Sequence, residues 1–173
     1  MSERATYYAY LDSPIGRILV AGDGETVSRI SFTTGHSVLQ PEPGWVDDGV
    51  PLRAATEQLE QYFAGERRRF DLRLSLRGTP FQKRAWEVLL TIPYGEAWSY
   101  GQVADALGSP GAARAVGRAN ATNPLPLVVP CHRVIGADGT LTGFGGGLRA
   151  KQWLLRFEGA LPGEQESGQP ALF

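Results

Sequence analysis

The chain has 173 residues, of which 42% are apolar and 20% are charged, and its formal net charge at pH 7 is −1. The length allows one or two domains with hydrophobic cores, and a charge so close to zero excludes an overall electrostatic argument for nucleic-acid binding. No apolar run approaches the length of about 20 residues that a membrane span requires. The N-terminus MSERATYYAY lacks the apolar core of a signal peptide, so we expect a cytoplasmic protein without a membrane partner.

A single cysteine, Cys131, limits the chemistry that the chain can carry. It excludes an intramolecular disulfide and any zinc site built from several cysteines, and we expect no metal. Cys131 is therefore either a small buried hydrophobic residue or a reactive thiol. Composition alone favours the first alternative, because free cysteine is among the most buried residue types.

The first half of the chain predicts a small sheet followed by a helix. Residues 5–34 contain three runs rich in β-branched and aromatic residues, separated by the turn sequences DSPIG and GDGE, which predicts an antiparallel meander. Residues 36–50 resemble a loop, in which we expect His36 to be solvated. Residues 51–65 place apolar side chains at helical spacing and end in glycine. Residues 67–78 alternate as a strand or an extended linker.

The second half predicts mainly helices. Thr79 and Gln82 form the pattern of a capping box, which Ser99 and Gln102 repeat at the start of SYGQVADALG. A further helix is expected to begin at once, at Ser109, and so close a succession of two helices predicts a helix-turn-helix. The segment LRAKQWLLRFEG predicts a short closing helix.

The charges of this half are distributed unevenly. No acidic residue lies between Asp105 and Asp138, whereas Arg114, Arg118 and Arg133 all lie there. Such a stretch suits a surface that faces phosphate groups. The alternative is that much of it is buried, which the apolar sequence NPLPLVVP supports in part.

Five segments occur in order across residues 79–160: SYGQVADALG, GAARAVGRAN, NPLPLVVPCHRVIG, GFGGG and KQWLLRFEG. Together they resemble the O6-alkylguanine-DNA alkyltransferases, also called methylated-DNA–protein-cysteine methyltransferases. The resemblance implies an α+β fold. Residues 1–76 would form an N-terminal α/β domain with an antiparallel sheet and a ribonuclease H-like layout. Residues 77–160 would form a mainly α C-terminal domain with a minor-groove helix-turn-helix and the active site. Independently of the resemblance, the sequence of residues 161–173 predicts a disordered tail.

The chemistry of such a site can be argued from the residues beside the resemblance. Displacement at an alkyl carbon needs a soft nucleophile, and the pKa of a free thiol, about 8.5, must be lowered by a base or a cation. Adjacent side chains on a strand point to opposite faces, so we expect the backbone at Cys131 and His132 to bend, with Pro130 contributing. The resemblance makes Glu158 the carboxylate that orients His132; a plain surface carboxylate is the alternative.

The resemblance implies roles for other residues. Tyr100 would donate a proton toward the guanine leaving group, Asn123 would brace the link from recognition helix to active site, and Arg114 would fill the gap that a flipped nucleotide leaves. A core aromatic and a plain turn asparagine are the alternatives for Tyr100 and Asn123. Four further residues would lie close to the DNA: Ala112, Ala113, Gly117 and Arg118. The pocket would be lined by residues from Val128 to Val134, Phe144 and Gly145.

This chain departs from the family pattern at three places. Phe144 stands where many relatives have tyrosine, so only an apolar lid role carries over. Gln152 replaces a common glutamate, for which we expect little catalytic effect. The cysteine and histidine ligands of the N-terminal zinc found in some relatives are absent from the sequence.

The leading prediction is a repair protein without a cofactor. It would flip O6-alkylguanine out of double-stranded alkylated DNA and move the alkyl group irreversibly to Cys131, once per molecule. O4-alkylthymine would be a second substrate of the same kind. It would be a monomer in solution that could cluster on DNA. The alternatives are a cysteine hydrolase using Cys131, His132 and Glu158, a non-catalytic lesion binder, and a transcription regulator. The hydrolase gives no role to the helix-turn-helix.

Overall fold

The computed structural model describes residues 4–32 and 40–161. The N-terminal half contains a four-stranded sheet in the order β3-β2-β1-β4. The strands β1, β2 and β3 form the predicted antiparallel meander, whereas β4 pairs parallel with β1 and lies in a segment predicted as a loop. The strand bounds are β1 (Tyr7–Leu11), β2 (Ile18–Gly22), β3 (Val27–Phe32) and β4 (Val46–Asp47). The predictions for His36 and for residues 162–173 lie outside the described residues.

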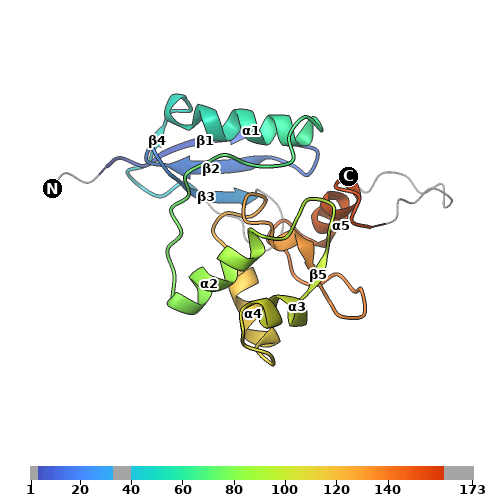
Figure 1. Ribbon diagram of the computed structural model, residues 1–173. Coiled ribbons are helices and arrows are strands. Elements are labelled where there is room, and N and C mark those ends of the chain that lie inside the picture. Colours follow the sequence, from blue (N-terminus) through green and yellow to red (C-terminus); the bar gives the residue numbers. More distant parts are fainter. Residues whose placement is uncertain (1–3, 33–39, 162–173) are drawn as a thin grey trace.

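The helix α1 (Arg53–Phe63) follows a 3-10 turn (Val50–Leu52) and lies over one face of the sheet (Figure 1). Its buried side chains, Ala55, Leu59 and Tyr62, are those that the helical spacing predicts. The chain leaves the helix at Gly65, whose φ of +78° lies in the left-handed region that glycine adopts without strain.

The C-terminal half is mainly helical, as predicted, and two of its helices begin at capping boxes. The backbone N–H groups of Gln82 and Gln102 donate to the hydroxyls of Thr79 and Ser99, and the side-chain oxygens of both glutamines accept from the backbone N–H groups of these cap residues. The half contains α2 (Pro80–Leu89), α3 (Tyr100–Ala106), α4 (Ala113–Ala121) and α5 (Leu148–Phe157), with a short parallel pair β5 (Trp98–Ser99) and β6 (Val134–Ile135).

One helix boundary differs from the prediction. The helix α4 begins at Ala113 rather than at Ser109, and no side chain caps it. Gly111 has a φ of +92°, which a helix cannot accommodate, so Ser109–Gly111 form part of the turn from α3. The recognition element of the helix-turn-helix is therefore shorter than the sequence predicts.

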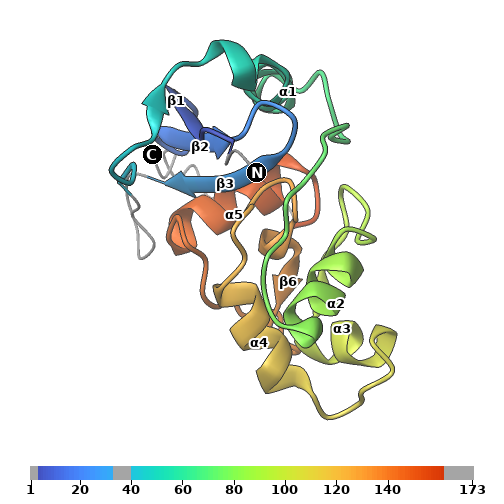
Figure 2. The same ribbon diagram turned by 90° about the vertical axis from the view of Figure 1, so that its left-hand side faces the viewer.

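The two halves share one hydrophobic core. Figure 2 shows α5 between the sheet and the other C-terminal helices. The outer edge of β3 is covered at two points, because Val27 pairs with the connecting segment at Leu74 and the Ile30 N–H donates to the Pro124 carbonyl at 2.9 Å. This arrangement confirms the predicted α+β fold, while the boundary at residues 76 and 77 stays a prediction. No helix within the described ranges is long and apolar enough to span a bilayer.

The capping box of α2 predicts a measurable loss of stability on its removal. Thr79→Ala deletes the hydroxyl that accepts from the Gln82 N–H at 3.1 Å, so we expect the free energy of unfolding to fall by about 1 kcal/mol. Urea titration followed by circular dichroism measures this change. Thr79→Ser keeps the acceptor and should stay close to the parent; an equal loss in both variants would contradict the capping role.

Candidate active site

The segment before Cys131 is held by two asparagines. The Asn123 side chain accepts from the Leu125 N–H at 2.9 Å and donates to the Val129 carbonyl at 2.8 Å. Asn120, at the end of α4, donates to the carbonyl of Cys131 at 3.1 Å. These bonds tie α4 and the turn after it to the segment that carries Cys131; the bracing role of Asn123 stays a prediction.

The backbone of this segment is bent and strained. Leu127 is buried with a φ of +78°, a left-handed conformation that costs a leucine about 1–3 kcal/mol. After Pro130, whose ψ of 66° is neither helical nor extended, Cys131–Arg133 form one turn of 3-10 helix. The backbone therefore bends where the sequence argument requires. It leaves the Cys131 thiol buried, with 4% of the residue exposed, and His132 fully buried.

His132 is oriented by Glu158, the residue just after α5. The distance from Nε2 of His132 to Oε2 of Glu158 is 2.9 Å, and both side chains are fully buried. A carboxylate can only accept, so Nε2 carries the proton and Nδ1 keeps its lone pair. Nδ1 is buried and has no hydrogen-bond partner among the described residues, which leaves it available as a base.

Two further residues hold the same carboxylate. Arg133 donates to both oxygens of Glu158, from Nε at 2.7 Å and Nη2 at 3.0 Å, and its Nη1 donates to the Ile92 carbonyl. The Tyr62 hydroxyl on α1 donates to Oε2 at 2.6 Å. Arg133 is 7% exposed, so the expectation that it faces phosphate groups is wrong: it neutralises a buried carboxylate instead.

The charges of this cluster favour a neutral imidazole beside an ionised carboxylate. Burial acts to raise the pKa of Glu158, but His132 and Arg133 outweigh it and lower the pKa to about 2. Burial lowers the pKa of His132 against the opposing effect of Glu158. Burial also keeps Tyr62 neutral, because it raises the pKa of the phenol well above its usual value, with Glu158 adding to the effect.

The thiol itself is protonated in this structure. Burial raises the pKa of Cys131 to about 11, while a hydrogen bond with Asn123 and the charge of Lys151 oppose that rise. Lys151 is fully buried on α5, where its Nζ donates to the carbonyls of Val134 and Thr142, both at 2.6 Å. Burial lowers the pKa of Lys151 to about 8, and the thiol opposes this shift. Activation of Cys131 therefore requires proton transfer to a nearby base.

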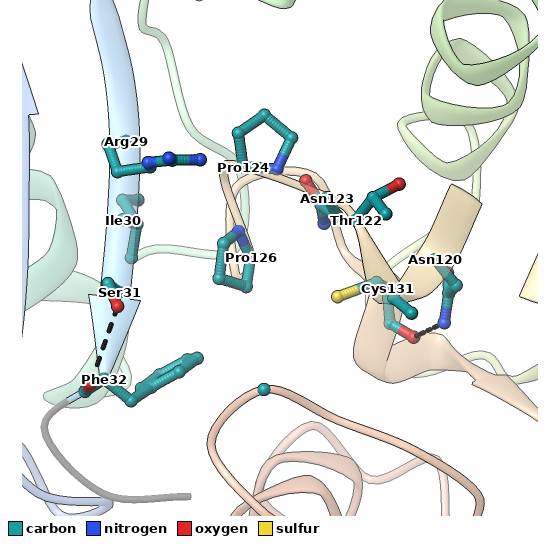
Figure 3. Close-up of a pocket in the computed structure, with 12 residues that line it drawn as sticks. Arg29, Ile30, Ser31, Phe32, Asn120, Thr122, Asn123, Pro124, Pro126 and Cys131 are labelled. Carbon is teal, nitrogen blue, oxygen red and sulfur yellow. Dashed lines mark hydrogen bonds between the residues drawn. The ribbon is translucent and has the colours of Figure 1, made fainter. Parts of the chain in front are cut away.

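A cavity of about 250 Å³ reaches Cys131. Figure 3 shows the sulfur directed into it, with β3 of the N-terminal half forming the opposite wall. Of the residues predicted for the pocket, Asn123 and Gly145 line it, whereas Val128, Pro130 and Val134 are buried and do not. Phe144 is buried and does not line the cavity; its ring packs between those of Phe32 and His132, with centroid distances of 5.2 and 6.4 Å.

The other predicted residues lie on the helix-turn-helix. Tyr100 begins α3 and its hydroxyl pairs with the Thr142 hydroxyl at 2.7 Å; it does not line the cavity. A Cβ on Gly117 would lie 3.9 Å from the Tyr100 ring, an ordinary van der Waals distance, so this contact does not by itself require glycine. The side chains of Arg114 and Arg118 are exposed on α4, near the half-buried Ala112 and Ala113.

Sequence reasoning missed Tyr62 and Lys151. For Lys151 a signal exists: Lys151, Leu154 and Glu158 share one face of α5, so two charged residues occupy the buried stripe. Tyr62 has the spacing of an apolar core residue, and nothing local indicates that its hydroxyl meets a residue 96 positions away.

Comparison with known proteins places this site in a family. The DNA-binding domain of 6-O-methylguanine DNA methyltransferase matches residues 80–160, and the ribonuclease-like domain of that protein matches residues 6–76. A methylated-DNA–protein-cysteine methyltransferase of Methanosarcina acetivorans is 49% identical over 154 residues, which cover 89% of this chain and 99% of the relative. A Mycobacterium tuberculosis OGT solved in complex with DNA has a TM-score of 0.82 and 50% identity, covering 88% of this chain and 92% of that one.

The fold and the buried cysteine site are those of a cysteine-dependent alkyltransferase attached to a DNA-binding domain. The chain belongs to the methylated-DNA–protein-cysteine methyltransferases, the 6-O-methylguanine DNA methyltransferase family. As a member of this family it is a DNA-repair methyltransferase, and the hydrolase alternative is not favoured.

The Tyr62 hydroxyl is expected to contribute measurably to stability. Tyr62→Phe keeps the ring but removes a hydrogen bond to a buried carboxylate, so the free energy of unfolding should fall by about 2 kcal/mol. Urea unfolding at pH 7 measures it. The control is Tyr10→Phe on β1, whose hydroxyl is not among the described donors to Glu158; similar losses in both variants would show that the bond to Glu158 is not the cause.

The lowered pKa of Glu158 predicts that the protein loses stability in acid. The folded pKa of Glu158, about 2, lies below the usual glutamate value of 4.5, so the carboxylate stabilises the fold above about pH 4.5, by about 3 kcal/mol, and the contribution disappears as the pH falls toward 2. Chemical unfolding from pH 6 to pH 2 should show this slope in the parent. Glu158→Gln should lack it, whereas Glu57→Gln, on the exposed face of α1, should retain it.

Proposed function

We propose that Cys131 is the residue that accepts the alkyl group from O6 of a guanine in duplex DNA, irreversibly and once per molecule. The observation that carries the proposal is the buried thiol at the wall of a cavity, beside a histidine whose free ring nitrogen is a base. A thioether is not hydrolysed, and the sequence contains no second cysteine that could regenerate the first.

The proposed reaction uses the groups around Cys131 in turn. Nδ1 of His132 takes the thiol proton, directly or through a water molecule, and the charge on Glu158 stabilises the imidazolium. The nearby Lys151 ammonium stabilises the thiolate. The sulfur attacks the alkyl carbon, the bond from that carbon to O6 breaks, and the departing guanine takes up a proton, for which Tyr100 is the proposed donor.

We propose that α3 and α4 bind the DNA through its minor groove. The support is the exposed pair Arg114 and Arg118 on a helix with small neighbours, in a stretch without acidic residues, and a relative solved with DNA. The thiol is buried, so the target nucleotide must leave the base stack to reach it. Arg114 would fill the vacated space, and the protein would act as a monomer.

Mass spectrometry of the intact protein tests this function. After incubation with a duplex that contains one O6-methylguanine, we expect a gain of one methyl group, mapped to Cys131 and limited to one per protein. Cys131→Ser, which keeps the shape but not the thiolate, should gain nothing, and an undamaged duplex should leave the parent unchanged.

Two other results would contradict the proposal. Lesion binding without a change in mass would make the chain a damage sensor. Repeated turnover without a lasting mass gain would indicate hydrolysis by the same cysteine.

A further inference from the structure

One wall of the cavity beside Cys131 comes from the N-terminal half, to which the sequence assigns no part in the chemistry. The strand β3 contributes Arg29, Ile30, Ser31 and Phe32, opposite the segment from Asn120 to Pro126. Figure 3 shows the Arg29 side chain directed toward Pro124, across the same space into which the Cys131 sulfur points. An alkyl group that extends beyond the carbon attacked by sulfur would therefore meet β3.

Arg29 gives this cavity its charge. No aspartate or glutamate lines it, and Arg29 is the one formally charged residue among the described residues that do. Within residues 4–32 and 40–161, no hydrogen bond or salt bridge engages the Arg29 guanidinium. The other lining residues are apolar or neutral. A cation in a partly enclosed, otherwise neutral space favours an anionic ligand.

The base of this side chain is fixed in position. Arg29 pairs with Ala21 in the sheet, and the next residue, Ile30, donates to the Pro124 carbonyl of the active-site segment at 2.9 Å. The main chain of Arg29 is thereby held at a set distance from the cavity, and only the side-chain torsions remain adjustable. The entropic cost of placing its charge on a ligand is reduced accordingly.

We propose that Arg29 makes this site selective for O6-alkyl groups that end in a carboxylate, of which carboxymethyl is the simplest. The proposal rests on the alkyl transfer proposed above. The Cys131 sulfur bonds to the methylene carbon, the bond from that carbon to O6 breaks, and the guanine retains the electron pair and takes a proton. The product is S-carboxymethylcysteine, and no further reactant is needed. Arg29 lies across the cavity from Cys131, so we expect its charge to act on the terminal group of a longer substituent.

The test compares three duplexes that differ only in the O6 substituent: methyl, carboxymethyl, and the neutral isostere carbamoylmethyl. Single-turnover rates are followed by intact-protein mass. We expect the parent to prefer carboxymethyl over carbamoylmethyl by about fivefold, equivalent to about 1 kcal/mol for a partly solvated ion pair. The preference should vanish in Arg29→Gln and persist in Arg29→Lys, and the ratio of the carboxymethyl rate to the carbamoylmethyl rate in each variant is the readout.

Arg53→Gln is the matched control. It removes the same charge from an exposed position at the start of α1 and should keep the fivefold preference. Equal rates for the two isosteres in the parent would overturn the proposal without reference to any variant. An equal slowing of all three substrates in Arg29→Gln would also overturn it, because Arg29 would then act on the DNA backbone. Failure of the parent on methyl itself would refute the alkyl transfer, a result distinct from either of these.

Discussion

The Glu158 carboxylate is a buried charge surrounded by three donor residues: the adjacent His132 and Arg133, and Tyr62, which lies 96 positions away in the chain. An isolated carboxylate in such a place would take up a proton, because the loss of hydration is too costly. Here His132, Arg133 and Tyr62 supply four hydrogen bonds to its two oxygens. The ionised form persists, and only that form fixes the histidine with its free lone pair facing away from the carboxylate. If one donor is removed, the remaining donors no longer fully compensate the buried negative charge of Glu158.

This cluster also connects the N-terminal half, with its sheet and α1, to the C-terminal helices. Tyr62 reaches Glu158 from α1, and β3 bonds to the segment that leads to Cys131 and forms a wall of the cavity. The strained backbone at Leu127 needs packing on all sides to persist, and the shared core provides it. The N-terminal half thus helps to hold the buried Glu158 carboxylate and forms one wall of the cavity beside Cys131.

What the sequence could predict was mostly local. The two capping boxes and the meander depend on residues within a few positions of one another, so their patterns are visible in the chain. The grouping of Cys131, His132 and Glu158 followed from the family resemblance. Tyr62 and the β3 wall could not be predicted, because helical spacing shows that a side chain is buried but not which distant group it meets. Arg133 was misinterpreted for the same reason: its sequence neighbours lack acid, whereas its partner lies 25 positions away.

Because Cys131 carries the only thiol of this sequence, the thiol content of a sample counts the molecules that have not reacted. Because no other cysteine contributes a background, the thiol content of a denatured sample equals the number of molecules that have not yet accepted an alkyl group. Denaturation is necessary for this count, since the folded protein buries the sulfur. A standard thiol reagent would then measure the remaining repair capacity of a preparation without any labelled DNA. The amount of thiol lost would report the cumulative alkylation to which the preparation had been exposed.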